Sequence, residues 1–185
     1  MNIQPVILCG GIGSRLWPIS RKKIPKQFIE IFDGKSLFDL SLERIIKLKC
    51  SKNPIIIVSE EHKFLVKEKL KKNKLKAKIL LEPESRNTTG AIYLAASYAN
   101  SNDNLLIMPA DHLIPQVNEF VDIINYSHQN LPKDHWLTFG VRPSNPSSSF
   151  GHIKVKENKL NITKKNKLFD VERFIEKPSY EESSR

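Results

Sequence analysis

The hydrophobic positions of this chain fall into short continuous runs, separated by longer amphipathic segments. Continuous apolar runs are typical of strands covered on both faces, whereas apolar residues at every third or fourth position indicate helices. The first run ends in a glycine-rich segment, where a regular strand would not continue. The runs that predict strands are residues 6–9, 55–58, 79–81, 105–108 and 136–141.

Helices are predicted between these strands. Ser36 with Asp39 three residues later forms the pattern of a helix N-terminus, and apolar residues then recur at helical spacing from Phe38 onward. A basic helix is expected from about residue 62, a third helix over residues 88–99 with Asn87 or Thr88 as its cap, and a fourth from near residue 118.

From Phe150 the pattern loosens, and residues 151–155 and 169–176 predict a hairpin around a polar tip. Strands that alternate with helices predict an α/β fold, with a Rossmann-like, mainly parallel sheet and flanking helices. Ligands of such a sheet bind at the carboxyl ends of its strands. Because no internal repeat or linker is visible, we expect residues 1–185 to form a single domain.

Length and composition narrow the class of protein. The 185 residues suffice for one domain with a hydrophobic core. No apolar run approaches the about 18 residues that a membrane helix needs, and the amino terminus lacks the pattern of a secretory signal. Cys9 and Cys50 alone form neither a disulfide framework nor a zinc site. We therefore expect a cytoplasmic protein with no membrane partner.

The chain carries 30 Lys and Arg against 20 Asp and Glu, a net charge of +10. A basic protein attracts phosphates, on nucleic acids or on nucleotides. Much of this charge, however, lies in residues 63–78 and 154–167, which are rich in lysine and poor in arginine and aromatic residues. Such stretches favour solvated faces over a nucleic-acid surface, so we expect no nucleic-acid partner.

A glycine loop is the strongest chemical signal. Three glycines within residues 10–13 expose backbone N–H groups that can bind phosphate oxygens. Arg15 lies in the loop and Lys26 follows it, which suits an extended polyphosphate. The loop is not a dinucleotide fingerprint, because Leu16 stands where the third glycine belongs, and it lacks the Gly-Lys-Ser/Thr of a Walker loop. The alternative is a turn with exposed basic residues.

Five motifs occur in order along nearly the whole chain. They are Gly10-Gly11-Ile12-Gly13-Ser14-Arg15-Leu16-Trp17-Pro18, Pro25-Lys26-Gln27-Phe28, Glu82-Pro83 with Arg86-Asn87-Thr88, Pro109-Ala110-Asp111-His112, and Phe174-Ile175-Glu176-Lys177-Pro178. Together they resemble the sugar-nucleotide pyrophosphorylases, and specifically the mannose-1-phosphate guanylyltransferases. The resemblance implies a nucleotidyltransferase of polysaccharide biosynthesis. Its substrates would be GTP and mannose 1-phosphate, its products GDP-mannose and pyrophosphate, and its cofactor Mg²⁺.

The resemblance also implies a role for each matched residue. Arg15 and Lys26 would be catalytic, Asp111 would hold the metal, and a third group would bind the sugar phosphate. That third group is Gly151, Glu176 and Lys177, and the nucleotide-binding group is Gly10, Gly11, Gly13, Ser14, Gln27, Glu82, Asn87 and Thr88.

Two of these assignments have an alternative interpretation when the residue types alone are considered. Asp111 follows a predicted strand, where a carboxylate can hold Mg²⁺, but an Asp after a proline is also a common turn or helix cap. Glu176 and Lys177 offer a hydroxyl acceptor and a cation side by side, as an exposed ion pair would. A phosphate monoester needs no strong general base, so catalysis would rest on positioning and charge neutralisation.

The chain departs from the family pattern in three places. Ser149 replaces a glycine near the sugar segment, which puts that turn in question, and the helix after Asn87 begins differently. The chain also stops at Arg185, before a Trp-Asn-Ser-Gly segment and a later metal-binding Asp. We therefore expect an incomplete nucleotidyltransferase domain that self-associates or needs a completing chain. The alternative is a truncated, non-catalytic nucleotide-binding remnant, or one piece of a split enzyme.

Overall fold

The chain divides into two compact units, Met1–Asp122 and Ile123–Arg185. The computed structural model describes residues 2–11, 16–82, 87–156 and 168–183. The first unit contains a four-stranded sheet, and the second contains a two-stranded hairpin. A single domain over residues 1–185 stays a prediction.

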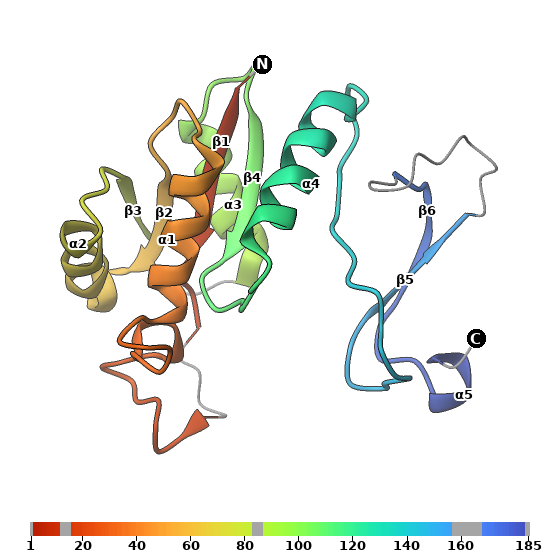
Figure 1. The fold of residues 1–185 in the computed structure, drawn as a ribbon, viewed down its shortest axis with the longest axis horizontal. Helices are drawn as coiled ribbons and strands as arrows, with labels where there is room; N and C mark the ends of the chain where they lie inside the picture. Colours follow the sequence, from red (N-terminus) through yellow and green to blue (C-terminus); the bar gives the residue numbers. More distant parts are fainter. Residues whose placement is uncertain (1, 12–15, 83–86, 157–167, 184–185) are drawn as a thin grey trace. The chain divides into compact units, whose positions relative to one another are not determined.

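The sheet of the first unit is parallel throughout, with the strand order β3-β2-β1-β4 (Figure 1). The central strand β1 pairs with β2 on one side and with β4 on the other. This arrangement confirms the predicted Rossmann-like, mainly parallel sheet, and four of the five predicted strands are present. Their bounds are β1 Ile3–Leu8, β2 Ile55–Ser59, β3 Lys78–Glu82 and β4 Asn104–Pro109.

Helices lie on both faces of this sheet, with α1 in front of it and α3 behind it in Figure 1. The predicted N-terminus of α1 is confirmed as a capping box: Ser36 Oγ accepts from the Asp39 backbone N–H at 3.2 Å, and Asp39 Oδ2 accepts from the Ser36 N–H at 2.9 Å. The helical elements are η2 Lys26–Phe28, α1 Leu37–Leu48, η3 Glu60–His62, α2 Lys63–Lys72, α3 Asn87–Tyr98 and α4 Val117–Asn130, which crosses the boundary between the units.

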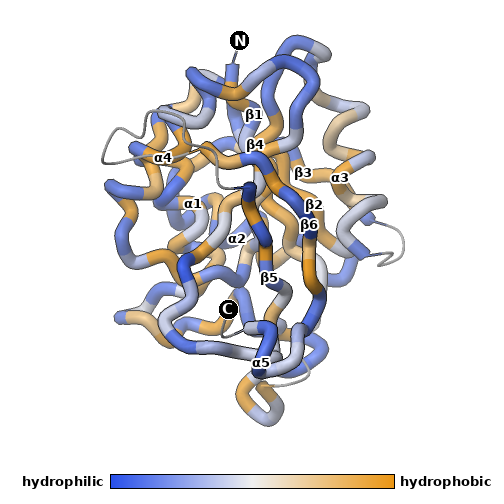
Figure 2. The backbone as a smooth tube through the Cα atoms, turned by 90° about the vertical axis from the view of Figure 1, so that its right-hand side faces the viewer, coloured by the Kyte–Doolittle hydropathy of each residue, from blue (hydrophilic) through white to orange (hydrophobic). Residues whose placement is uncertain are grey.

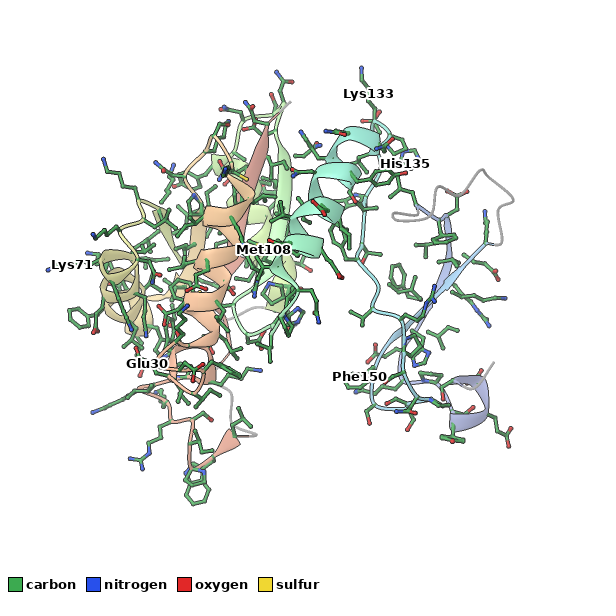
Figure 3. The ribbon with its side chains drawn as sticks, viewed as in Figure 1. Glu30, Lys71, Met108, Lys133, His135 and Phe150 are labelled. Atoms are coloured by element: carbon green, nitrogen blue, oxygen red, sulfur yellow. The ribbon has the colours of Figure 1, made fainter. Side chains whose placement is uncertain are left out.

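The core of the first unit lies on both faces of the two middle strands. Val6, Ile55 and Ile57 pack in one cluster with Ala91 and Ala95 of α3. Ile7 and Ile56 alternate onto the opposite face and are buried there as well, as expected for strands covered on both sides. Figure 2 shows the hydrophobic stretches along these strands, and Figure 3 labels the buried Met108 of β4. Each buried Val, Ile or Met side chain of this core contributes about 1.5–3 kcal/mol.

The second unit is built around the antiparallel hairpin of β5 His152–Val155 and β6 Val171–Ile175, which confirms the predicted hairpin. A short helix, α5 Tyr180–Ser183, follows it. The strand predicted over residues 136–141 is wrong: residues 131–151 contain neither helix nor strand. Trp136 and Val141 are 91% and 93% exposed. An apolar run becomes a strand only when a neighbouring strand takes up its backbone hydrogen bonds, and this segment has no such neighbour among the residues that the structure describes.

The longest helix in the described part of the chain, α4, has 14 residues. No described helix is both long enough and apolar enough to cross a membrane.

Candidate functional site

Two chain segments with predicted site residues leave the sheet of the first unit at its carboxyl edge. Gly10 and Gly11 follow β1, and Asp111 follows β4. The two strands are in register at this edge, since Leu8 lies opposite Pro109 and the Ala110 N–H donates to the Leu8 carbonyl at 3.0 Å. The sheet therefore places the glycine loop beside Asp111, at the edge where ligands of parallel sheets bind.

The side chain of Gln27 stabilises the start of the glycine loop. It is 1% exposed, and its Nε2 donates to the carbonyl of Cys9 at 3.1 Å and to that of Gly11 at 3.4 Å. Gly11 has φ 96°, a left-handed conformation that favours glycine. Two hydrogen bonds from one buried side chain thus hold the loop in a conformation that a residue with a Cβ would adopt only with strain.

Lys26 and Asp111 form an ion pair beside this loop. Lys26 Nζ lies 2.5 Å from Asp111 Oδ2, and the two side chains are 34% and 28% exposed. Lys26 is the first residue of the 3-10 turn η2, and Gln27, whose side chain bonds to the loop, is the second. The turn therefore fixes the position of the Lys26 backbone. The predicted phosphate-binding cation and the predicted metal-binding carboxylate are therefore brought together, within reach of solvent.

Glu82, the last residue of β3, extends toward the same loop. Its Oε2 lies 3.9 Å from the position that a Cβ on Gly10 would occupy. Its Oε1 is buried and has no hydrogen-bond partner within the described residues. Buried carboxylate oxygens normally accept hydrogen bonds, so this oxygen suits an N–H donor supplied by a ligand.

Cys9 directly follows β1 but does not offer a nucleophile. Its side chain is 1% exposed, and burial, with a smaller contribution from the Asp111 carboxylate, raises the pKa of the Cys9 thiol. The thiol stays protonated at neutral pH, and only the thiolate is reactive. Across residues 2–11, 16–82, 87–156 and 168–183, no three His, Cys, Asp or Glu side chains gather into a metal-binding group. Asp111 therefore stands as a single carboxylate.

The three predicted sugar-phosphate residues lie together in the second unit. A Cβ on Gly151 would meet Glu176 Oε2 at 3.1 Å, so the absence of a side chain at Gly151 makes room for the Glu176 carboxylate. Glu176 Oε1 lies 3.8 Å from Lys177 Nζ. Both charged side chains are exposed, directly after β6.

The turn around Ser149 tolerates the loss of the family's glycine. The Ser149 N–H donates to Ser147 Oγ at 3.2 Å, and Ser149 is not among the described residues with positive φ. A glycine is therefore not required at this position.

Five predicted nucleotide-binding or catalytic residues make no contact described above. Gly13, Ser14 and Arg15 lie outside the described residues. Asn87 and Thr88 form the exposed first turn of α3, with Asn87 at φ 60°.

His62 lies near the site, but the sequence analysis did not single it out. At the start of a basic helix, no motif around it indicates a function. It is 5% exposed, and both of its ring nitrogens make hydrogen bonds. One of these bonds reaches Lys22, in the segment that leads to Lys26.

The Nucleotidyl transferase family model matches residues 4–185 of this chain. The chain therefore belongs to the nucleotidyl transferase family, which confirms the family predicted from its motifs. Relatives named mannose-1-phosphate guanylyltransferase are 39% identical to it, from Escherichia coli and Klebsiella pneumoniae, each over 97% of this chain and 38% of the relative. The chain thus spans less than half the length of these relatives.

Solved structures agree on the fold. A Thermus thermophilus protein described as mannose-1-phosphate geranyltransferase superimposes with a TM-score of 0.82 and 28% identity, over 100% of this chain and 52% of that protein. A Helicobacter pylori protein described as mannose-6-phosphate isomerase gives a TM-score of 0.78 and 34% identity, over 100% and 64%. In both comparisons the match covers the whole of this chain, and the known structure extends beyond it.

Proposed function

We propose that this chain forms the nucleotide-binding part of a mannose-1-phosphate guanylyltransferase, which transfers a guanylyl group from GTP to mannose 1-phosphate. The observation that carries this proposal is the pair of Lys26 and Asp111, 2.5 Å apart beside a glycine loop that Gln27 braces. A fixed cation, a carboxylate and exposed loop N–H groups at one edge of a parallel sheet form a binding site for a polyphosphate. The names of the most similar relatives support the choice of substrates.

The reaction requires charge neutralisation more than proton transfer. A phosphate oxygen of mannose 1-phosphate attacks the α-phosphorus of GTP, a new P–O bond forms, and the bond to the leaving pyrophosphate breaks. The attacking monoester is already an anion, so the main barrier is repulsion between anions. Lys26 acts on this barrier as a point charge, and we assign Arg15 of the glycine loop to fork two phosphate oxygens.

Asp111 suits a Mg²⁺ ion that takes most of its ligands from the nucleotide. Mg²⁺ is commonly held by one or two carboxylates together with substrate phosphates and water, and Asp111 is a single, partly exposed carboxylate beside the loop. When bound, the metal supplies further positive charge against the phosphates. In the ligand-free protein, Asp111 holds Lys26 at the edge of the sheet, so the cation is already in place before the nucleotide arrives.

Glu82 is our candidate for the residue that selects guanine. Guanine presents an N1–H and an exocyclic amine on one edge, and a carboxylate accepts hydrogen bonds from both. Adenine offers an acceptor at N1, which would leave the buried Glu82 oxygen unpaired and costs binding free energy. The buried Oε1 of Glu82, which lacks a partner within the described residues, supports this assignment. Asn87 and Thr88, which open the next helix, complete the proposed nucleotide-binding group with Ser14 and the loop glycines.

Gly151, Glu176 and Lys177 are the proposed sugar-phosphate group. Glu176 would accept hydrogen bonds from sugar hydroxyls, while Lys177 would bind the phosphate. The close approach of Gly151 to Glu176, at 3.1 Å for an added Cβ, supports a shared role.

A non-catalytic nucleotide-binding module is the second candidate function. The observation that favours it is that Asp111 stands as a single carboxylate, with no group of three His, Cys, Asp or Glu side chains among the described residues. For self-association or for a completing chain, the exposed Phe150 and Phe174 of the hairpin unit offer apolar surface. GTP is a nucleotide of the cell interior, so we place the reaction in the cytoplasm, where GDP-mannose would serve polysaccharide biosynthesis.

Pyrophosphate release from GTP and mannose 1-phosphate, with Mg²⁺, tests the proposal directly. The chain is assayed alone and together with a separately expressed polypeptide that corresponds to the remaining length of the Escherichia coli relative. Release in either arm supports the guanylyltransferase. Binding of Mg–GTP by calorimetry without release in both arms supports the non-catalytic module, and no heat with any nucleoside triphosphate contradicts both.

A further inference from the structure

We propose that His62 is a positioning residue, which holds in place the segment that carries Lys26. The expected effect of His62 on nucleotide binding rests on the proposed function. Its effect on the position of residues 22–28 does not. His62 lies at the end of η3, just beyond the carboxyl end of β2. It touches neither the glycine loop nor Asp111 in any described contact, so its influence on the site would pass through the segment of residues 22–28.

The two hydrogen bonds of His62 fix the orientation of its ring. The distance from Nε2 to the Lys22 carbonyl oxygen is 2.8 Å, and the distance from Nδ1 to Ser59 Oγ is 2.9 Å. A carbonyl only accepts, so Nε2 must carry a proton; in the neutral ring Nδ1 then accepts from the Ser59 hydroxyl. His62 thus connects the end of a buried strand to the backbone of the Lys26 segment.

The bond to Lys22 restrains more than one residue. Arg21 and Ile24 pair with each other through two backbone hydrogen bonds, at 3.1 and 2.9 Å, so Lys22 lies in a closed turn directly before Pro25 and Lys26. Because a carbonyl of this turn is held by His62, the whole turn is held with it. The position where η2 begins follows from that restraint.

His62 also contacts the segment on the other side of Lys26. Its ring centroid lies 6.4 Å from that of Phe28, tilted by 44°, and Phe28 in turn packs on Phe38 of α1 at 5.3 Å. Farther along, Lys69 and Lys72 of α2 donate to Glu30 at 2.6 and 2.9 Å, and Figure 3 shows Glu30 near the N-terminal end of α1. The stretch with Lys26 is therefore anchored on both sides, and His62 contributes to each.

Amide hydrogen exchange of the ligand-free protein tests the structural part. His62→Phe keeps a ring against Phe28 but removes both hydrogen bonds, and it should speed exchange in residues 20–28 by about tenfold, with β1 and α3 unchanged. His62→Gln, whose amide can still donate to Lys22, should restore most of the protection. The control is His135→Phe, an exposed histidine of the other unit, which should leave residues 20–28 unchanged. Unchanged exchange in His62→Phe overturns the proposal.

Coupling to Lys26 tests the functional part. We expect His62→Phe to weaken Mg–GTP binding by about tenfold in the wild-type background and by less than about twofold in Lys26→Ala, because the two changes act through one group. Equal losses in both backgrounds would mean that His62 acts elsewhere and would overturn the proposal. A wild-type protein that binds no Mg–GTP contradicts the proposed function instead, and the exchange measurement then still decides whether His62 holds the segment.

Discussion

Lys26 and Asp111 are far apart in the sequence, yet the charged atoms of their side chains lie 2.5 Å apart at the carboxyl edge of the sheet. The parallel pairing of β1 with β4 produces this contact, since it brings the loops after both strands to one edge. A lysine that already faces a carboxylate loses little side-chain freedom when phosphates arrive. Several measurements can test what this edge does.

Lys26→Ala should lower the turnover of pyrophosphate release by about 10²–10³-fold, because it removes a positive charge that stabilises the transition state. The apparent affinity for mannose 1-phosphate should change little. Arg15→Ala should behave in the same way. Lys23→Ala, which alters an exposed lysine three residues before Lys26, is the matched control and should retain full turnover. Steady-state kinetics on the active form of the protein measure both quantities, and unchanged turnover in Lys26→Ala would count against its assigned role.

Glu82→Gln should reduce the preference for GTP over ATP by about 10–100-fold, since one carboxylate oxygen that accepts from guanine becomes an amide donor. The dissociation constants of Mg–GTP and Mg–ATP, measured by calorimetry, give the ratio. Glu61→Gln makes the same chemical change at an exposed residue of η3 and should leave the ratio intact. If Glu82→Gln binds both nucleotides as the wild type does, guanine is recognised elsewhere.

Gly151→Ala should raise the KM for mannose 1-phosphate with little loss of stability. The new Cβ would lie 3.1 Å from Glu176 Oε2, and this exposed carboxylate can move away at low cost. The shift would take Glu176 from its proposed contact with sugar hydroxyls. Gly140→Ala is the control, because its Cβ would meet Ile153 at 3.8 Å, an ordinary contact. Equal KM values for the two variants would separate Gly151 from the sugar site.

Asp39 should make the stability of the first unit sensitive to acid. Burial raises the pKa of the Asp39 carboxyl, but hydrogen bonds from Lys69 at 2.8 Å, from Ser36 and from Asn73 outweigh it and lower the pKa to about 2. The pKa in the folded state therefore lies below that in the unfolded state. The stabilisation is complete above the unfolded-state pKa and is lost as the pH falls through that value toward about 2.

The expected contribution of this carboxylate is about 2 kcal/mol near pH 6. The difference in free energy of unfolding between the wild type and Asp39→Asn, measured with denaturant, should shrink as the pH falls from about 6 to about 2. Asp33→Asn changes an exposed carboxylate nearby and should show no such trend. A difference for Asp39→Asn that does not vary with pH would mean that the charge of Asp39 does not carry the effect.

Local patterns predicted most of the secondary structure because their causes are local. The continuous apolar runs at residues 55–58 and 105–108 became strands, the first buried and the second partly buried, and Ser36 with Asp39 became a capping box through contacts within one turn. The run at residues 136–141 is also rich in apolar residues but formed no strand, because pairing depends on a partner that the run itself does not specify. A strand is a property of two segments, and a cap is a property of one.

The sequence by itself determined the family, the order of most elements and the residue types of the proposed site, since glycines, lysines and carboxylates at set spacings carry their chemistry with them. Only the tertiary structure decided which of these residues meet: Lys26 with Asp111, Glu82 with Gly10, Gly151 with Glu176, and His62 with Lys22. These contacts depend on strand register and on the closure of long loops. Both are set by the packing of each unit as a whole, so no local pattern in the chain encodes them.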